Sequence, residues 1–236
     1  MKKNSTFTGL ELSELQFNKL ENLAHIFWEW NQKMNLSALR DLESIRLKHL
    51  ADSLLFWPEL SPLIQEKNLD LGTGGGFPLL PLAIMSEKAW WGIDATQKKL
   101  TAVQAMADEL ELKIQTKSGR FEELAHQSAW RSQFDFISAR AVAPWPQLLE
   151  LALGFLKKDG VFAAWQGPSF LQDQQDYPQY VKHFGGEIIQ VYQKKLAADA
   201  DRYLVLIQKQ KDTPSQYPRA YSQIRTKVLR EFGRKN

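Results

Sequence analysis

Hydrophobic and polar residues follow two different periods along this chain. Between residues 13 and 34 the apolar side chains recur every three or four positions, which predicts an amphipathic helix. A second helix is expected over residues 42–55, with Asp41 as its N-cap. From residue 68 onward, short apolar runs that end in glycine or polar residues alternate with helical segments, a pattern typical of buried strands joined by helices.

The expected elements define a fold class. Strands are predicted over 68–72, 90–95, 113–119, 134–141 and 161–167, and helices over 78–85, 97–112, 145–158 and 169–184, with a short helix from Phe121. This alternation predicts an α/β fold with a mostly parallel sheet. Two further strands, 187–196 and 202–210, have no helix between them and therefore predict an antiparallel hairpin at one edge. We expect a helical cap (1–66) packed on a main domain (67–210), followed by a basic tail (211–236).

The basic charge lies at the end of the chain. The 236 residues carry 30 Lys and Arg against 27 Asp and Glu, a net charge of +3, yet from position 209 eight basic residues face only Asp212 and Glu231. Such a stretch is either a solvated charged surface or a contact for RNA phosphates, and its local concentration favours phosphates. The candidate RNA contacts are Lys209, Lys211, Arg219, Arg225 and Lys227.

Composition excludes several classes of protein. The chain has no cysteine, which excludes disulfides, thiolate metal sites and a cysteine nucleophile. Its four histidines are far apart in sequence, so we predict no metal site. The N-terminus lacks the apolar segment of a signal peptide, and the longest apolar run, near residues 79–85, is far short of the roughly 20 residues of a membrane span. A cytoplasmic protein without membrane contact is expected.

The segment from Leu69 to Pro78, LDLGTGGGFP, follows an expected strand and opens an expected helix. Glycines in such a turn allow positive φ and a close approach of the backbone to a ligand. A dinucleotide fingerprint beginning at Gly72 would need a small third residue where Phe77 stands, and no P-loop Gly-Lys-Ser/Thr follows. The pattern that fits is the hDhGxGxG turn of methyltransferases that use S-adenosylmethionine, with Gly72 and Gly74 in register.

Asp94 supports this interpretation. It ends the second expected strand, about 20 residues beyond the turn, where a carboxylate can accept hydrogen bonds from both ribose hydroxyls of an adenosine. An alternative role is to cap the helix that begins at Gln97, and both roles are compatible.

The chemistry of the methyl acceptor narrows the class further. Methylation of cytosine C5 in RNA uses a cysteine, which the chain lacks. Adenine N6 methyltransferases commonly carry Asn/Asp-Pro-Pro-aromatic after the fourth strand, where this chain has residues 138–144, SARAVAP. A ring nitrogen such as guanine N7 has a free lone pair and no proton to lose, so alignment alone can supply the catalysis, and we assign no general base.

Several segments in order resemble one family. Residues 30–37 resemble its WNxxxNLT element, 48–54 its rHilDSL element and 213–219 its TPkkYPR segment, and the glycine turn, GIDATQKK (92–99), GRFEE (119–123) and SARA (138–141) lie between them. Together they are similar to the bacterial 16S rRNA (guanine-527 N7) methyltransferase family, RsmG or glucose-inhibited division protein B. The resemblance implies a class I, Rossmann-like fold, S-adenosylmethionine as cofactor, and 16S rRNA or the 30S particle as partner. No dimerisation helix is evident in the sequence, so a monomer is expected.

The resemblance also implies cofactor contacts. Gly72 and Phe77 stand where the family's glycine turn touches the cofactor, and Phe121 and Glu122 where its adenine is bordered. Arg140 matches the arginine of the SRA motif; from its place at a strand end it could meet the cofactor carboxylate, an RNA phosphate or solvent. Gln166 replaces the family's usual lysine, so we give it no role. Two other functions stay open: a methyltransferase of another substrate, and a non-catalytic S-adenosylmethionine-binding factor in ribosome assembly.

Overall fold

The computed structural model describes residues 7, 9–172, 177–196 and 200–224. In this part of the chain one sheet has the order β3-β2-β1-β4-β5-β7-β6. Its strands are β1 (Asn68–Leu71), β2 (Trp90–Asp94), β3 (Ile114–Ser118), β4 (Phe134–Arg140), β5 (Leu156–Gln166), β6 (Gly186–Lys195) and β7 (Asp201–Lys209). The first five strands are parallel, and β7 runs antiparallel to both β5 and β6. The predicted α/β sheet with an antiparallel edge hairpin is confirmed.

The first two N-terminal helices begin at side-chain caps, of which Asp41 was predicted. Helix α1 (Glu14–Met34) starts at Ser13, whose side chain accepts a hydrogen bond from Gln16 N while the Gln16 side chain accepts one from Ser13 N. It ends at Asn35 in the left-handed conformation. Asp41 Oδ1 accepts from Ser44 N and begins α2 (Leu42–Ile45). A π-helical turn (Arg46–Ala51), α3 (Asp52–Leu54), α4 (Trp57–Leu60) and a 3₁₀ turn (Ser61–Leu63) complete the cap.

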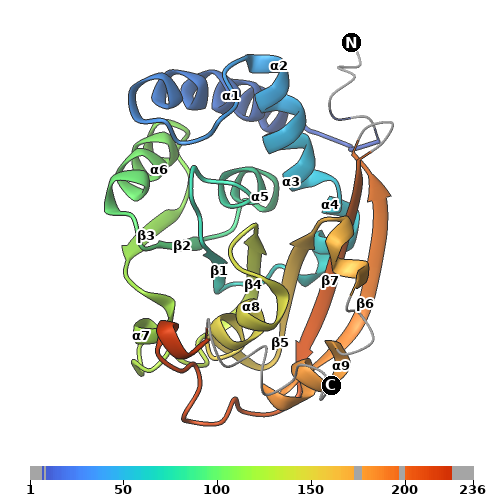
Figure 1. The fold of residues 1–236 in the computed structure, drawn as a ribbon. Coiled ribbons are helices and arrows are strands. Elements are labelled where there is room, and N and C mark those ends of the chain that lie inside the picture. The colour runs from blue at the N-terminus through green and yellow to red at the C-terminus, as the bar shows by residue number, and fades with distance from the viewer. Residues whose placement is uncertain (1–6, 8, 173–176, 197–199, 225–236) are drawn as a thin grey trace.

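Helices cover both faces of the sheet (Figure 1). The cap packs with α5 (Leu79–Ser86) and α6 (Gln97–Glu109) into one apolar core, whose fully buried members include Phe27, Leu80, Met106 and Phe136. The second core lies with α7 (Phe121–Leu124), α8 (Trp145–Ala152) and α9 (Tyr177–His183). The cap therefore shares its hydrophobic core with the main domain. Among the described residues, no helix combines the length and the apolar character that a bilayer crossing requires.

Two predicted helices were partly wrong. The helix expected over 145–158 ends at Ala152, and β5 already begins at Leu156. Asp159, at φ 66°, lies in a bulge of β5, where the pairing with β4 shifts between Phe134 and Phe136, so it interrupts a strand and does not end a helix. Of the helix expected over 169–184, the structure shows a 3₁₀ turn (Pro168–Gln172) and α9, with 173–176 outside the described residues.

The start of the predicted tail is part of the fold. After β7 the chain returns across the molecule and ends, in the described part, beside α7 (Figure 1). Arg131 holds it by donating to the carbonyls of Thr213, at 2.6 Å, and Tyr217, at 2.9 Å. Arg219 forms an ion pair of 2.8 Å with Glu150, which has no exposed surface. We call residues 213–224 the C-terminal strap.

Candidate active site

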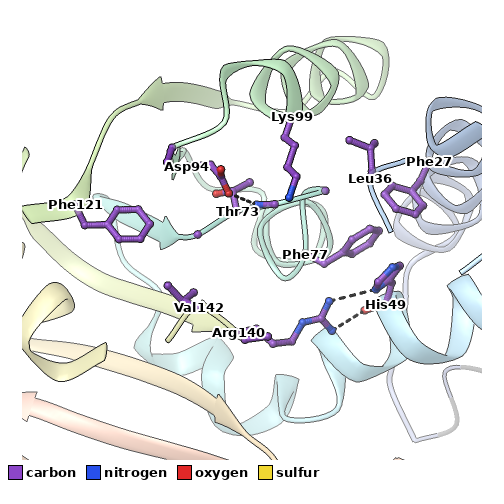
Figure 2. Close-up of a pocket in the computed structure, with 15 residues that line it drawn as sticks. Phe27, Leu36, His49, Thr73, Phe77, Asp94, Lys99, Phe121, Arg140 and Val142 are labelled. Atoms are coloured by element: carbon purple, nitrogen blue, oxygen red, sulfur yellow. Dashed lines mark hydrogen bonds between the residues drawn. The ribbon is translucent and has the colours of Figure 1, made fainter. Parts of the chain in front are cut away.

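A cavity of about 350 Å³ lies at the carboxyl ends of β1, β2 and β4 (Figure 2). The strand order reverses between β1 and β4, and ligands of open α/β sheets bind at such a switch point. The turn after β1, the segment after β2, the end of β4 and the cap all contribute to its lining, which is Phe27, Leu36, His49, Gly72–Gly75, Phe77, Asp94, Ala95, Lys99, Phe121 and Arg140–Val142. Figure 2 shows Phe121 and Val142 at one end of the cavity, and Phe27, Phe77 and His49 at the other.

The glycine turn forms the floor of this cavity. Gly72 has φ 71°, and a Cβ there would lie 2.5 Å from Val142 Cγ2, so both conformation and space require glycine. Gly74 has φ 55°, and a Cβ there would meet only the Gly72 carbonyl, at 3.7 Å. The turn therefore leaves space for a ligand directly above the backbone of Gly74.

Asp94 is tied to this turn by its own carboxylate. Its Oδ2 accepts from Gly74 N at 2.9 Å, and its Oδ1 accepts from Thr96 N at 2.8 Å, next to the start of α6. The second contact is made to Thr96, the N-cap residue of α6, so Asp94 holds the chain just before the helix and is not itself its N-cap. Each carboxylate oxygen has two acceptor sites, so each retains one for a ligand hydroxyl.

Arg140 points from the end of β4 toward the cap. Its Nη1 donates to Asp52 Oδ2 at 2.8 Å, and Arg202 Nε donates to Asp52 Oδ1 at 2.7 Å. One buried carboxylate thus lies between two guanidinium groups, which leaves an excess positive charge beside the cavity. No local pattern predicts this pairing, because Asp52 lies on a different element, 88 residues from Arg140.

His49 belongs to the cavity wall. Its ring stacks on Phe77, with ring centroids 4.6 Å apart, and its Nε2 lies 2.8 Å from Ser37 Oγ. Burial, reinforced by the charge of Arg140, lowers the pKa of His49 to about 4, so the imidazole is neutral at pH 7. The structure therefore places this histidine in the cavity wall as a neutral ring.

Asp70 lies in β1, immediately before the turn, and is fully buried. Its Oδ1 accepts from the Ser138 hydroxyl at 2.7 Å, and its Oδ2 has no hydrogen-bond partner among the described residues. Burial raises the pKa of this carboxyl to about 7. The hDhGxGxG pattern contains this residue, but sequence reasoning assigned it no role.

The predicted cofactor residues come together. The large cavity is lined by Gly72, Gly74, Phe77, Asp94, Phe121 and Arg140. Glu122 lies in a smaller adjoining cavity, where Arg120 Nε donates to its Oε1 at 3.0 Å. Sequence reasoning missed Lys99, which lines the large cavity from α6 (Figure 2).

The residues predicted to contact RNA differ in their exposure to solvent. Lys209 has no exposed surface and donates to Leu153 O and Thr213 Oγ1, so its prediction as an RNA contact was wrong. Arg219 is paired with Glu150, and its side chain is only 12% exposed, which leaves little of it for a phosphate. Lys211 is exposed, whereas Arg225 and Lys227 lie outside the described residues.

Comparison with known proteins agrees with this geometry. Residues 16–201 match the family model described as rRNA small subunit methyltransferase G, GidB. A protein named ribosomal RNA small subunit methyltransferase G from Desulfitobacterium hafniense (strain Y51) is 38% identical over 215 residues, which cover 89% of this chain and 88% of that protein. The protein of the same name from Lactococcus lactis subsp. lactis (strain IL1403) is 34% identical over 215 residues, 89% of this chain and 90% of that protein.

Solved structures agree on the fold. An S-adenosylmethionine-dependent methyltransferase from Clostridium acetobutylicum ATCC 824 superposes with a TM-score of 0.53 at 14% identity, over 79% of this chain and 99% of that chain. This similarity confirms the predicted class I methyltransferase fold. The family match confirms the predicted resemblance and S-adenosylmethionine as cofactor, and the chain belongs to the rRNA small subunit methyltransferase G family.

Proposed function

We propose that this protein transfers the methyl group of S-adenosylmethionine to N7 of guanine-527 in 16S rRNA of the small ribosomal subunit. Family membership supports the cofactor and the class of reaction. The choice of a ring nitrogen rests on the chemistry of the cavity wall, and the choice of nucleotide on the resemblance of the motifs.

The residues of the cavity fit the cofactor. Asp94 has free acceptor sites for the two ribose hydroxyls, and Gly74 leaves open space beside the turn for the methionine half of the cofactor. The excess positive charge at Arg140 would serve either the cofactor carboxylate or an RNA phosphate.

The single observation that carries the choice of a ring nitrogen is the state of the ionisable groups. Among the described residues that line the large cavity, these are His49, Asp94, Lys99 and Arg140. Asp94 is held by two backbone amides, and His49 is neutral and packed between Phe77, Arg140 and Ser37. None is placed to remove a proton from a substrate. Guanine N7 needs no proton removed, because its lone pair already lies in the plane of the base.

The bound cofactor supplies an activated methyl group on a sulfonium. The chain then has to hold that group in line with the guanine and exclude water. The turn from Gly72 to Phe77 and the rings of Phe77 and His49 provide a rigid apolar wall for this alignment.

The test is a methylation map of rRNA. Naked 16S rRNA and 30S particles that lack the modification are incubated with the protein and S-adenosylmethionine, cleaved with borohydride and aniline, and examined by primer extension. We expect new strand scission at guanine-527 in at least one of the two substrates, and none with Asp94→Ala. Tritium transfer without scission at that guanine would indicate another target, and cofactor binding without any transfer would indicate an assembly factor.

A further inference from the structure

A second cavity of about 140 Å³ adjoins the first one at the carboxyl end of β3. The two cavities share Ala95, Phe121 and Val142 as lining residues. The remaining lining of the smaller cavity is Gly119, Arg120, Glu122, Ala143, Leu151 and Tyr221. Of these residues, Tyr221 alone comes from the C-terminal strap.

Tyr221 is held in place by its neighbours. The guanidinium carbon of Arg120 lies 4.6 Å from the centroid of the Tyr221 ring, and Arg120 also binds Glu122. Three residues further along the strap, Ile224 is fully buried against Leu151 and packs with Phe121 and Ala143. The strap thus fixes an aromatic ring at the mouth of the cavity, with 39% of Tyr221 exposed.

The strap itself is anchored at several points upstream. Arg131 binds three of its carbonyls, those of Thr213, Pro214 and Tyr217. Arg219 binds the buried Glu150 through both its backbone N and its guanidinium. These contacts position Tyr221 before any ligand arrives, which lowers the ordering cost of binding.

We infer that the C-terminal strap, through Tyr221, forms the outer wall of the adenine subsite. This inference rests on the proposed function, because it places the cofactor ribose at Asp94. A ribose at the end of β2 directs the attached base past Ala95 toward Gly119 and Phe121, which is into the smaller cavity. Its walls are mostly apolar and aromatic, as a planar base requires, and Glu122 offers an acceptor for the exocyclic amine of adenine.

The strap therefore belongs to the cofactor site and is more than an RNA-binding extension. Adenine in this cavity would cover part of the exposed Tyr221 ring. The aromatic face of Tyr221 should therefore contribute to the affinity for the cofactor, whereas its hydroxyl group should not.

The experiment is calorimetry on the full chain with two ligands, S-adenosylhomocysteine and 5′-deoxy-5′-methylthioadenosine. The second ligand has the adenine and ribose but lacks the amino acid part. We expect Tyr221→Ala to weaken both ligands about tenfold, which corresponds to about 1.4 kcal/mol, and Tyr221→Phe to bind as the wild type does. The control Gln223→Ala changes an exposed strap residue outside the cavity lining and should leave both affinities unchanged.

Equal affinities for the wild type and Tyr221→Ala would overturn the inference while leaving the proposed cofactor site intact. The inference is also overturned if Tyr221→Ala raises the KM for rRNA but leaves both calorimetric affinities unchanged, because the ring would then contact RNA and not the cofactor. If the wild type binds neither ligand, the proposed function fails and the inference fails with it. Thermal unfolding of each variant shows whether an affinity change reflects the ring or a loss of structure.

Discussion

Asp52 and Arg140 form an ion pair of 2.8 Å that connects the N-terminal cap to the carboxyl end of β4. Asp52 also binds Arg202 of β7, so one carboxylate orients two guanidinium groups from different strands. Through this contact the cap fixes the position of Arg140, and it supplies His49 to the same wall. The cap is therefore a structural part of the site.

The first prediction concerns this pair. Asp52→Asn keeps the shape of the side chain but removes the charge that orients Arg140 and Arg202. Breaking a largely buried pair leaves uncompensated charge, so we expect the free energy of unfolding to fall by about 2–4 kcal/mol. Displacement of Arg140 should lower kcat/KM for rRNA methylation about 100-fold. Urea unfolding and tritium-transfer kinetics measure the two effects.

Glu66→Gln is the matched control for Asp52→Asn. Glu66 pairs with Lys88 at the surface, where its side chain is 80% exposed, so stability should change by less than about 0.5 kcal/mol. If Asp52→Asn behaves like this control in both assays, Arg140 does not depend on Asp52 for its position.

The second prediction concerns Asp94. Its carboxylate both binds the glycine turn and offers acceptor sites to the ribose, so Asp94→Ala should weaken S-adenosylhomocysteine binding about 10- to 100-fold. A ribose role predicts a further difference: the wild type should prefer the ribose ligand over its 2′-deoxy analogue, and Asp94→Ala should lose that preference. Asp108→Ala, on the same helix α6 as Lys99 but outside the cavity lining, is the control for calorimetry. An unchanged preference in Asp94→Ala would leave Asp94 with the structural role alone.

The sequence predicted the parts of the site that follow from local pattern. The glycine turn and Asp94 were found because a strand, a turn and a helix N-terminus are local features with a fixed spacing. The hairpin at the sheet edge followed from the missing helix between its strands. Such features need only a short window of sequence.

Features that depend on distant contacts were not predictable in this way. Lys209 was counted with the basic tail, although it ends β7 and its ammonium is buried against Leu153 and Thr213. The ion pairs of Arg140 and Arg219 join segments 88 and 69 residues apart. The sequence around a charged residue does not show whether its side chain will meet solvent, RNA or a buried carboxylate, because tertiary folding decides which partner lies near it.

The third prediction separates the basic residues by their exposure. Lys211 is exposed, so Lys211→Glu should weaken binding of the protein to 16S rRNA, and the slope of log affinity against log salt should become shallower by about one unit. Exposed Lys158 of β5, outside the predicted tail, serves as control through Lys158→Glu. Equal losses in both variants would indicate a general charge effect and no specific phosphate contact at Lys211.

The fourth prediction concerns the pH dependence of stability. Burial, together with the nearby charge of Arg131, lowers the pKa of Lys209 to about 7 from its ordinary value of 10.5. Between these two values the unfolded chain carries the extra proton, so this residue makes the free energy of unfolding rise with pH; below pH 7 both states are protonated and its contribution is constant. Relative to Lys209→Met, wild-type stability should therefore increase by up to about 1.4 kcal/mol per pH unit from pH 7.5 to 10.

Chemical denaturation at several pH values tests this slope. Lys158→Met, at an exposed position of β5, should give a curve parallel to the wild type, because folding leaves that ammonium in contact with solvent. Parallel curves for Lys209→Met and the wild type would contradict a depressed pKa. If the difference in the free energy of unfolding from the wild type grows with pH for Lys209→Met and not for Lys158→Met, Lys209 acts inside the protein, although it was predicted to contact RNA. There it anchors the strap through Thr213.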